Sequence, residues 1–569
     1  MTRAMTRNVS IAVVTITMSV AGLTSPASAQ QQSTSEARIQ ELIRAAAESA
    51  ARTQAPAQSQ TTRTTAVAVG DTRPVVRLGL DDAVRFALER NLDIQVQRLN
   101  PQINDIAVAS IQSVYHPNLT SQIQTQSNTQ AGSSTLSGTQ AAGQTVVAGS
   151  SLYNAGFTQS IPRGGGALTV QLNNNRTTTT SLNALINPTY NTAWSGQYAQ
   201  PLMKGFKIDS TRQQLQVARI NRDISDVQLR ASITNTLTSV RNAYWDYVFA
   251  TQAVEVSQRS LDLATKLVQD NQTRVEVGTM APIDVVQARS EQATRRQALV
   301  TAQSARRTTE LVLKRLIVSG TDDPNWDAAL DPTDRPDFRP EAIDLPAAIR
   351  RALSERTDID IAKKNTQTND VTLKYLQDQM RPQADLVAFY GFNGQGGTQL
   401  ITSGTGVNRE VTGRIPGGYL DALSALFHNT LPRWTVSMNF SYPLGLSAQQ
   451  ASVARARVQL NQVQAQLKQV ELQVATDVTN AAITAQNTAE AVQASQVARE
   501  LAQQKLEAEQ SKFEVGMSTN YFVVQAQRDL ADASNSELRA ILNYRKALVE
   551  FERVQSTTLQ NLNITVLGR

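Results

Sequence analysis

Residues 275–288 read VEVGTMAPIDVVQA, and residues 513–526, which lie 238 positions later, read FEVGMSTNYFVVQA. The same offset relates residues 240–313 to residues 478–551 without an insertion. Each copy is a long helical pattern, a reversal centred on a glycine, and a second helical pattern. An internal repeat of this length predicts two copies of one helical hairpin.

A second repeat lies upstream of each hairpin. Residues 80–88 (LDDAVRFAL) match residues 345–353 (LPAAIRRAL), and an Asp-Ile pair follows each of them at the same distance. The offset here is 265, so the two halves differ by an insertion between these segments and the hairpins. The chain is therefore interpreted as a tandem duplication rather than as two unrelated domains.

The first residues have the pattern of a secretory signal peptide. Arg3 and Arg7 precede the mostly apolar residues 9–23, and Ala27-Ser28-Ala29 offers a small-residue cleavage site. A membrane anchor is the alternative, but the apolar stretch is short and is interrupted by Thr and Ser. Export of a chain without cysteine leaves no disulfides and no site for lipid attachment, so packing and assembly must hold the protein together.

Long helices with coiled-coil spacing are predicted in both halves. Apolar residues step by threes and fours along residues 220–248 and again along residues 460–485. The first pattern contains no Gly or Pro from about Asp209 to Val277, which corresponds to a helix on the order of 100 Å long. Such a rod suits a protein that spans the periplasm. Its remaining faces carry Gln, Asn, Ser, Thr and Ala, and either line a water-filled tube or form an ordinary polar surface.

Segments with the period of strands lie between the helices. They mix β-branched and aromatic residues with small polar ones, as two-faced strands do. The first half contains residues 117–126, 153–162, 167–175 and 194–202, and the second contains residues 384–393 and 434–444. We expect surface loops at residues 127–149 and 394–418.

These strands suggest a membrane barrel. Trp194 and Trp434 lie near the start of matching strands, where they suit an interfacial aromatic girdle, although a soluble sandwich would also bury aromatic residues. The segments supply four strands at minimum, and six if residues 153–175 form an extra hairpin. Because the smallest membrane barrels have about eight strands, one chain cannot close a barrel and we expect an oligomer. Three chains with four strands each would give a twelve-stranded pore.

The residues around the two glycines resemble the TolC-like outer-membrane efflux proteins, also called outer membrane factors. The likeness rests on Val277-Gly278-Thr279 with the Asp and Gln that follow, and on the second Val-Gly at 515–516, and it covers about residues 77–560. It implies an α+β fold in which duplicated long coiled-coil helical hairpins form a periplasmic α-barrel and β-strands contribute to a trimeric outer-membrane β-barrel.

The resemblance also implies a function. The family acts as a channel-tunnel in the outer membrane, with a large periplasmic part, and serves as the exit duct of tripartite efflux or type I secretion systems. The implied partners are a homotrimer of this chain, a periplasmic adaptor (membrane fusion protein), an inner-membrane RND or ABC pump, and outer-membrane lipid. The cargo is not identified by the sequence.

With this family in view, five segments are expected along the chain. They are a signal peptide at 1–29, a flexible N-terminal periplasmic extension at 30–76, a first structural repeat at 77–317, an equatorial linker at 318–342, and a second structural repeat at 343–569.

The resemblance implies two sets of site residues. The hairpin tips are expected to contact the adaptor, and they comprise Val277, Gly278 and Thr279, and more loosely Val515, Gly516 and Thr519. The periplasmic gate is expected at Asp284, Phe522 and Gln525. Since Phe522 and Gln525 stand where better-known members carry acidic rings, we expect closure by steric fit and dewetting rather than by charge. The alternative for Phe522 is ordinary packing between helices.

Other classes of function find little support in the sequence. Two histidines, His116 and His428, with no cysteine and scattered carboxylates do not suggest a catalytic or metal site, so no enzyme activity and no cofactor is expected. Removal of the signal peptide leaves a formal charge of +4 from the +6 of the whole chain, too little to favour nucleic acid. Two rivals remain: a periplasmic adaptor, which would have a single hairpin between small β-domains, and a trimeric surface coiled-coil protein, which would have a single rod.

Overall fold

The computed structural model describes residues 73–564, apart from 133–137, 140–142, 336, 405–408, 430, 443 and 446. The predicted signal peptide, and the predicted extension up to residue 72, lie outside the described residues. None of the described helices carries an apolar stretch of the length needed to cross a membrane.

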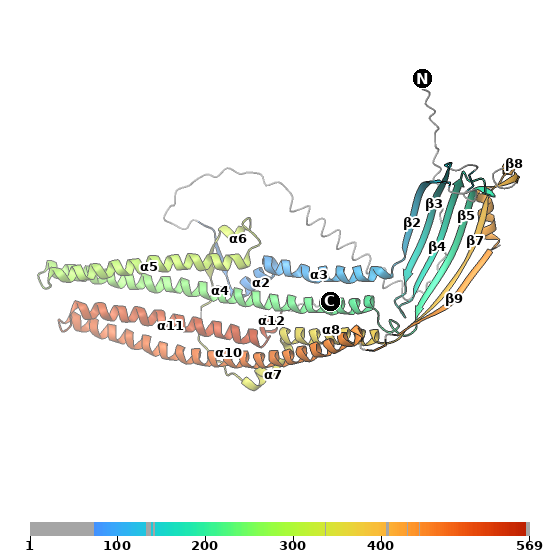
Figure 1. The fold of residues 1–569 in the computed structure, drawn as a ribbon. Coiled ribbons are helices and arrows are strands. Elements are labelled where there is room, and N and C mark those ends of the chain that lie inside the picture. The colour runs from blue at the N-terminus through green and yellow to red at the C-terminus, as the bar shows by residue number, and fades with distance from the viewer. Residues whose placement is uncertain are drawn as a thin grey trace, which may run out of the picture. The chain divides into compact units, whose positions relative to one another are not determined.

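Both predicted helical hairpins are present, in register with the repeat. The first consists of α4 (Ser210–Glu276) and α5 (Pro282–Ile317), and the second of α10 (Ala448–Glu514) and α11 (Asn520–Val554). The helices α4 and α10 have 67 residues each, about 100 Å at ~1.5 Å per residue. The hairpins pack against each other mainly through α4 and α11, and both reversals lie at the same end (Figure 1).

The upstream repeat forms a pair of shorter helices in each half. These are α2 (Leu80–Arg90) and α3 (Leu92–Gln112), and α7 (Leu345–Glu355) and α8 (Thr357–Gln379). The helix α3 packs along α4, and α8 packs along both α10 and α4. The helices α3 and α8 therefore lie beside those parts of α4 and α10 that are nearest the strands (Figure 1).

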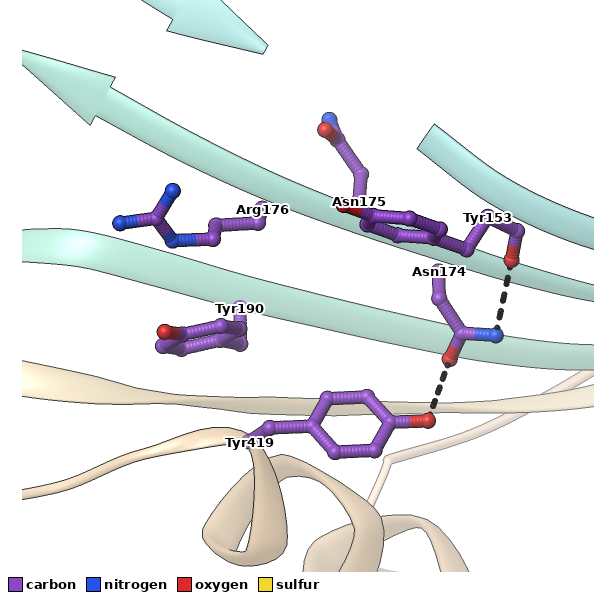
Figure 2. A pocket seen from close by; sticks show the side chains of 6 residues that line it. All are labelled: Tyr153, Asn174, Asn175, Arg176, Tyr190 and Tyr419. Atoms are coloured by element: carbon purple, nitrogen blue, oxygen red, sulfur yellow. Dashed lines mark hydrogen bonds between the residues drawn. The ribbon is translucent and has the colours of Figure 1, made fainter. Parts of the chain in front are cut away.

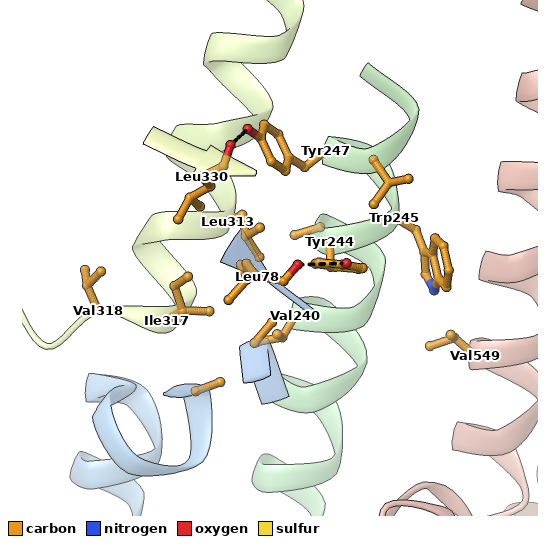
Figure 3. Packing of buried hydrophobic residues seen from close by; sticks show 14 residues of the cluster. Leu78, Val240, Tyr244, Trp245, Tyr247, Leu313, Ile317, Val318, Leu330 and Val549 are labelled. Carbon is orange, nitrogen blue, oxygen red and sulfur yellow. Dashed lines mark hydrogen bonds between the residues drawn. The ribbon is translucent and has the colours of Figure 1, made fainter. Parts of the chain in front are cut away.

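The predicted equatorial linker packs against the first hairpin in its earlier part, and Phe338 in its later part packs on Tyr544 of the second hairpin. It contains α6 (Pro324–Asp327) and β6 (Ala329–Pro332), and β6 pairs in parallel with β1 (Val75–Leu78). The main hydrophobic cluster forms here, where Leu78 and Leu330 meet Tyr244 and Tyr247 of α4 (Figure 3). The Tyr247 hydroxyl donates to the Leu330 carbonyl, and the Tyr244 hydroxyl lies 3.1 Å from the Leu78 carbonyl oxygen. A short α12 (Thr558–Asn561) follows the second hairpin.

The other described strands form one antiparallel sheet. Five strands follow the order β2-β3-β4-β5-β7, and β8 and β9 both pair with β7, at residues 399–403 and 383–393 respectively. Their bounds are β2 (Asn118–Ala131), β3 (Thr145–Ser160), β4 (Ala167–Thr179), β5 (Ile186–Pro201), β7 (Gln383–Ser403), β8 (Glu410–Ile415) and β9 (Leu431–Ser441). Six long strands are present among the described residues, so the extra hairpin that the sequence left open exists, as β3 and β4.

The two expected surface loops are partly strand. The strands β2 and β3 extend into residues 127–149, and β7 and β8 extend into residues 394–418. The prediction failed because the polar and glycine residues there hide the alternation, whereas pairing uses backbone groups that every residue except proline supplies in full.

The sheet has one apolar face and one polar face. One row of register partners runs from Leu119 through Phe157, Val170, Gly196 and Tyr390 to Trp434. The residues two or four positions away on each strand add, among others, Ile123, Tyr153, Leu172, Trp194, Tyr198, Leu386, Phe392, Val436 and Met438 to the same face. The intervening residues are mostly Gln, Asn, Ser and Thr, including Gln122, Asn154, Asn173, Ser195 and Thr435. This alternation places apolar side chains on one surface of all six long strands.

Candidate functional site at the hairpin tips

Both hairpin tips are built by the same helix-ending motif. Gly278 and Gly516 have φ angles of 83° and 80°, the left-handed conformation that favours glycine. At the first tip, the amide of Gly278 donates to Val275 at 3.0 Å and that of Thr279 donates to Arg274 at 2.8 Å. At the second, Gly516 donates to Phe513 at 3.2 Å and Met517 to Lys512 at 2.8 Å. The predicted reversal centred on a glycine is confirmed at both tips, where the glycine ends the first helix of each hairpin.

The tips expose apolar side chains. Val277 and Val515, which cap α4 and α10, are 73% and 70% exposed. Thr279 turns its hydroxyl back onto the Arg274 carbonyl at 3.0 Å, and Thr519 is the exposed N-cap of α11. Met517 and Tyr521 add further exposed apolar surface beside the second tip. An apolar surface at the end of a rod is a feature of interaction sites.

The structure places the three predicted gate residues in the first two turns of the helices that leave the tips. Asp284 lies in the first turn of α5 and is partly buried, and its carbonyl accepts a bond of 3.3 Å from the Asn520 side chain of α11. Gln525 donates to Asp529 at 2.8 Å. Phe522 is 54% exposed and packs edge-to-face on Tyr521. The residues of this turn that enter the core of the hairpins are Val523 and Val524.

A buried ionic link, which sequence reasoning missed, ties the two hairpins together near the tips. The Glu291 carboxylate of α5 accepts from Arg528 of α11, with Nε at 2.9 Å, and from Arg295 one turn along α5 at 2.7 Å. Glu291 is 1% exposed at its side chain, whereas Arg528 is 49% exposed. Burial by itself raises the pKa of Glu291, but the hydrogen bonds and charges of the two arginines outweigh it and hold that pKa below its usual value.

Two further contacts join the hairpins at the same level. The buried Asn271 side chain of α4 donates to the Asn520 side chain at 2.8 Å. The Arg274 guanidinium lies 4.4 Å from the centre of the Phe513 ring and donates to the Phe513 carbonyl at 3.2 Å. A signal for the ionic link was available in the sequence: Glu291 continues the stripe of Val285 and Ala288 at a spacing of three, so a charge occupies a core position.

A separate pocket lies on the sheet, not at the tips. It has a volume of about 370 Å³, and α9 (Tyr419–Phe427) covers one side of it (Figure 2). The Tyr419 hydroxyl donates to Asn174 at 3.1 Å, and the Arg176 guanidinium lies 6.0 Å from the centre of the Tyr190 ring. The helix lies against Gly394 and Gly396, where a Cβ atom would collide with the Ala422 backbone. Within the described ranges, no group of His, Cys, Asp and Glu side chains could hold a metal ion.

Comparison with known proteins gives a consistent result. The model of the family described as outer membrane efflux protein matches residues 83–318 and 348–554. No curated protein matches the chain.

Solved structures with the same fold include the outer-membrane channel OprN (14% identity, TM-score 0.59, 88% of this chain and 98% of that one). They also include the CmeC outer membrane channel of Campylobacter jejuni (12% identity, TM-score 0.57, 86% and 90%). The open state of the MtrE outer membrane channel of Neisseria gonorrhoeae is similar as well (16% identity, TM-score 0.56, 84% and 88%).

Proposed function

Because this chain belongs to the outer membrane efflux protein family, we propose that it forms the exit duct of a tripartite efflux or type I secretion system. The protein is an outer membrane efflux channel and not an enzyme, and its helices form the periplasmic part. The observation that carries the finer proposal is a two-faced sheet, open at both edges, which continues directly into two long helical hairpins.

The open edges support assembly into a homotrimer. The strand β2 pairs only with β3, and β9 pairs only with β7, so each leaves one row of backbone groups without a partner inside the described chain. In lipid each such group costs several kcal/mol unless it is paired. Three copies arranged in a ring satisfy both edges at once, and they bring the apolar face of the sheet to the lipid and the polar face to a central pore.

The same arrangement gives the helices a role in passive transport. Three copies of the two hairpins surround a duct that continues from the pore through the periplasm to the tips. The tips would receive the periplasmic adaptor through Val277, Gly278 and Thr279, and through Val515, Gly516 and Thr519. An inner-membrane RND or ABC pump would deliver the cargo. Asp284, Phe522 and Gln525 would close the duct at rest.

Assembly and location are tested on the full chain. The expected result is a protein that sediments with outer membranes and has the mass of a trimer in mild detergent. A folded monomer inserted in lipid would refute the trimeric duct. A protein that sediments with the inner membrane would favour the adaptor instead.

Adaptor contact is tested with a photo-crosslinking residue at Val277. The matched control is Leu472 of α10, which is similarly exposed at 70% but lies far from the tips along the helix. We expect a crosslink to an adaptor from Val277 and none from Leu472. Equal crosslinking at both positions would remove the tips as the specific contact.

A further inference from the structure

The two halves of the chain contribute unequal numbers of strands. The second half supplies two long strands, β7 and β9, whereas the first supplies four, from β2 to β5. The difference corresponds to the insertion between the two sequence repeats, whose offsets are 265 upstream and 238 downstream. The hairpin of β3 and β4 is therefore an addition to a unit that otherwise has two strands per half.

The added hairpin lies inside the sheet and not on top of it. The strand β3 pairs with β2 along residues 118–131, and β4 pairs with β5 from Ala167 to Thr177. Its side chains follow the alternation of their neighbours: Phe157 and Val170 lie on the apolar face, and Asn154 and Asn173 lie on the polar face. A hairpin folded away from lipid would not need this match.

Exposure distinguishes the two long strands that each have a neighbour on one side only. Every residue of β2 is exposed, and all but one of β9 are, whereas β3, β4 and β5 are mostly partly buried. Leu119 of β2 and Trp434 of β9, which share one row of the sheet, are 79% and 72% exposed. Long exposed edges with apolar side chains are templates for pairing with another chain.

The directions of these strands allow a ring. The strand β2 follows α3 and runs away from the helices, whereas β9 runs towards them and is followed by α10. A β2 strand and the β9 strand of a neighbouring copy that stands in the same orientation are therefore antiparallel. This is the relation that every other long pair in the sheet already has.

We propose that β2 of one copy pairs with β9 of the next, so that three copies close a barrel of eighteen strands. The proposal rests on the trimeric duct proposed above and deepens it. Because barrel diameter grows roughly linearly with strand number, this barrel would be about 1.5 times as wide as a twelve-stranded one and have about twice its cross-section. The outer-membrane part of the duct is then wide, and selection of cargo falls on the tips.

Introduced cysteine pairs test the proposal cleanly, because the chain has no cysteine of its own. One arm places a cysteine at Gln122 or Gln124 of β2 and another at Thr435, Ser437 or Asn439 of β9, all on the polar face, and scans every combination. A disulfide requires Cα atoms within about 7 Å, so at least one combination should link the copies into a covalent trimer. The second arm, Gln122→Cys with Asn154→Cys, joins direct register partners of β2 and β3 within one chain.

The outcomes separate this proposal from the duct itself. Links between β2 and β9 across copies, together with the link within one chain, support eighteen strands. Three results in an otherwise identical trimer would each overturn the proposal. They are a disulfide from Asn173→Cys of β4 to a cysteine in β9 of the next copy, no disulfide between β2 and β9 in any combination, and no disulfide between β2 and β3 within one chain. A wild-type trimer imaged in lipid supplies an independent count, in which twelve strands would also overturn the proposal. Absence of a trimer would instead refute the proposed function.

Discussion

Replacing Glu291 by glutamine removes the charge that joins the two hairpins near their tips. The carboxylate is buried and accepts from Arg528 across the hairpins and from Arg295 along its own helix. Hydrogen bonds to charged groups contribute about 1.5–3 kcal/mol each, and breaking a buried pair costs about 3–5 kcal/mol. Glutamine keeps one acceptor, and half-exposed Arg528 regains water. We therefore expect a loss of about 2–3 kcal/mol in the local stability of the tips.

Hydrogen exchange of backbone amides measures this loss where it occurs. The amides of α5 and α11 around Glu291 and Arg528 should exchange roughly 30- to 150-fold faster, since local opening free energies set the protection. The amides of the sheet should not change. A matched control is Glu537→Gln, which breaks the pair of Glu537 with Arg499, 2.6 Å apart, within the second hairpin only. Unchanged protection in the Glu291 variant, or an equal effect in the control, would refute the role of the ionic link.

Acidification should reproduce the effect in the wild-type protein. Because the pKa of Glu291 is lowered in the folded state, the folded chain binds fewer protons there than the unfolded chain does. The stabilisation is then fully present above the ordinary carboxyl pKa of about 4.3, and is lost as the pH falls from there through the folded value. The difference in tip protection between the wild type and the glutamine variant should shrink over this range. A difference that stays constant down to a pH of about 2, well below that ordinary pKa, would contradict the assignment.

Three further variants test the tips and the gate. Gly516→Val places a β-branched residue at a φ of 80°, which strains the turn by about 1–2 kcal/mol or more. Because no atom lies within 4 Å of the added Cβ, the strain stays in the turn, and adaptor crosslinking should fall or the tip should open while the trimer persists. Gly516→Asn is the milder control. Phe522→Ala should raise single-channel conductance in planar bilayers with little loss of trimer stability, because the ring is half exposed in the single chain; lost stability with unchanged conductance would remove Phe522 from the gate. Asp284→Ala should chiefly change the cation preference, and an unaltered reversal potential would count against a place in the duct.

The sequence predicted the helices well, because their signals are local and occur twice. The offsets of 238 and 265 relate α4 to α10 and α2 to α7 at their first residues. The strands were harder, since β2 carries only Leu119 and Ile123 as large apolar residues among Gln, Asn, Ser and Thr. Its polar face holds no repeating signal, so the strand was expected to end five residues too early. The helix α9 was missed because nine residues give too short a window for a helical period.

In the candidate site, too, the features with local signals were predicted and those that join distant residues were not. The glycine caps follow from the residues of one turn, so the amino-acid pattern alone is enough to place Gly278 and Gly516. The bond between Asn271 and Asn520 and the pair of Glu291 with Arg528 join residues from different hairpins. Their partners depend on how α11 packs against α4 and α5, which no local pattern records.

The equal length of α4 and α10 sets a single length for both hairpins. Each helix has 67 residues and ends at the same cap, so the two tips finish level, and at ~1.5 Å per residue the length fixes the gap that the rods can bridge. Removing one heptad from only one hairpin would offset the tips by about 10 Å and separate the residues that join them. Removing the same heptad from both would shorten the two hairpins equally and keep their tips at the same level. The distance that the hairpins bridge in the periplasm is thus set by two helices of equal length, and the lengths of these helices can change only together.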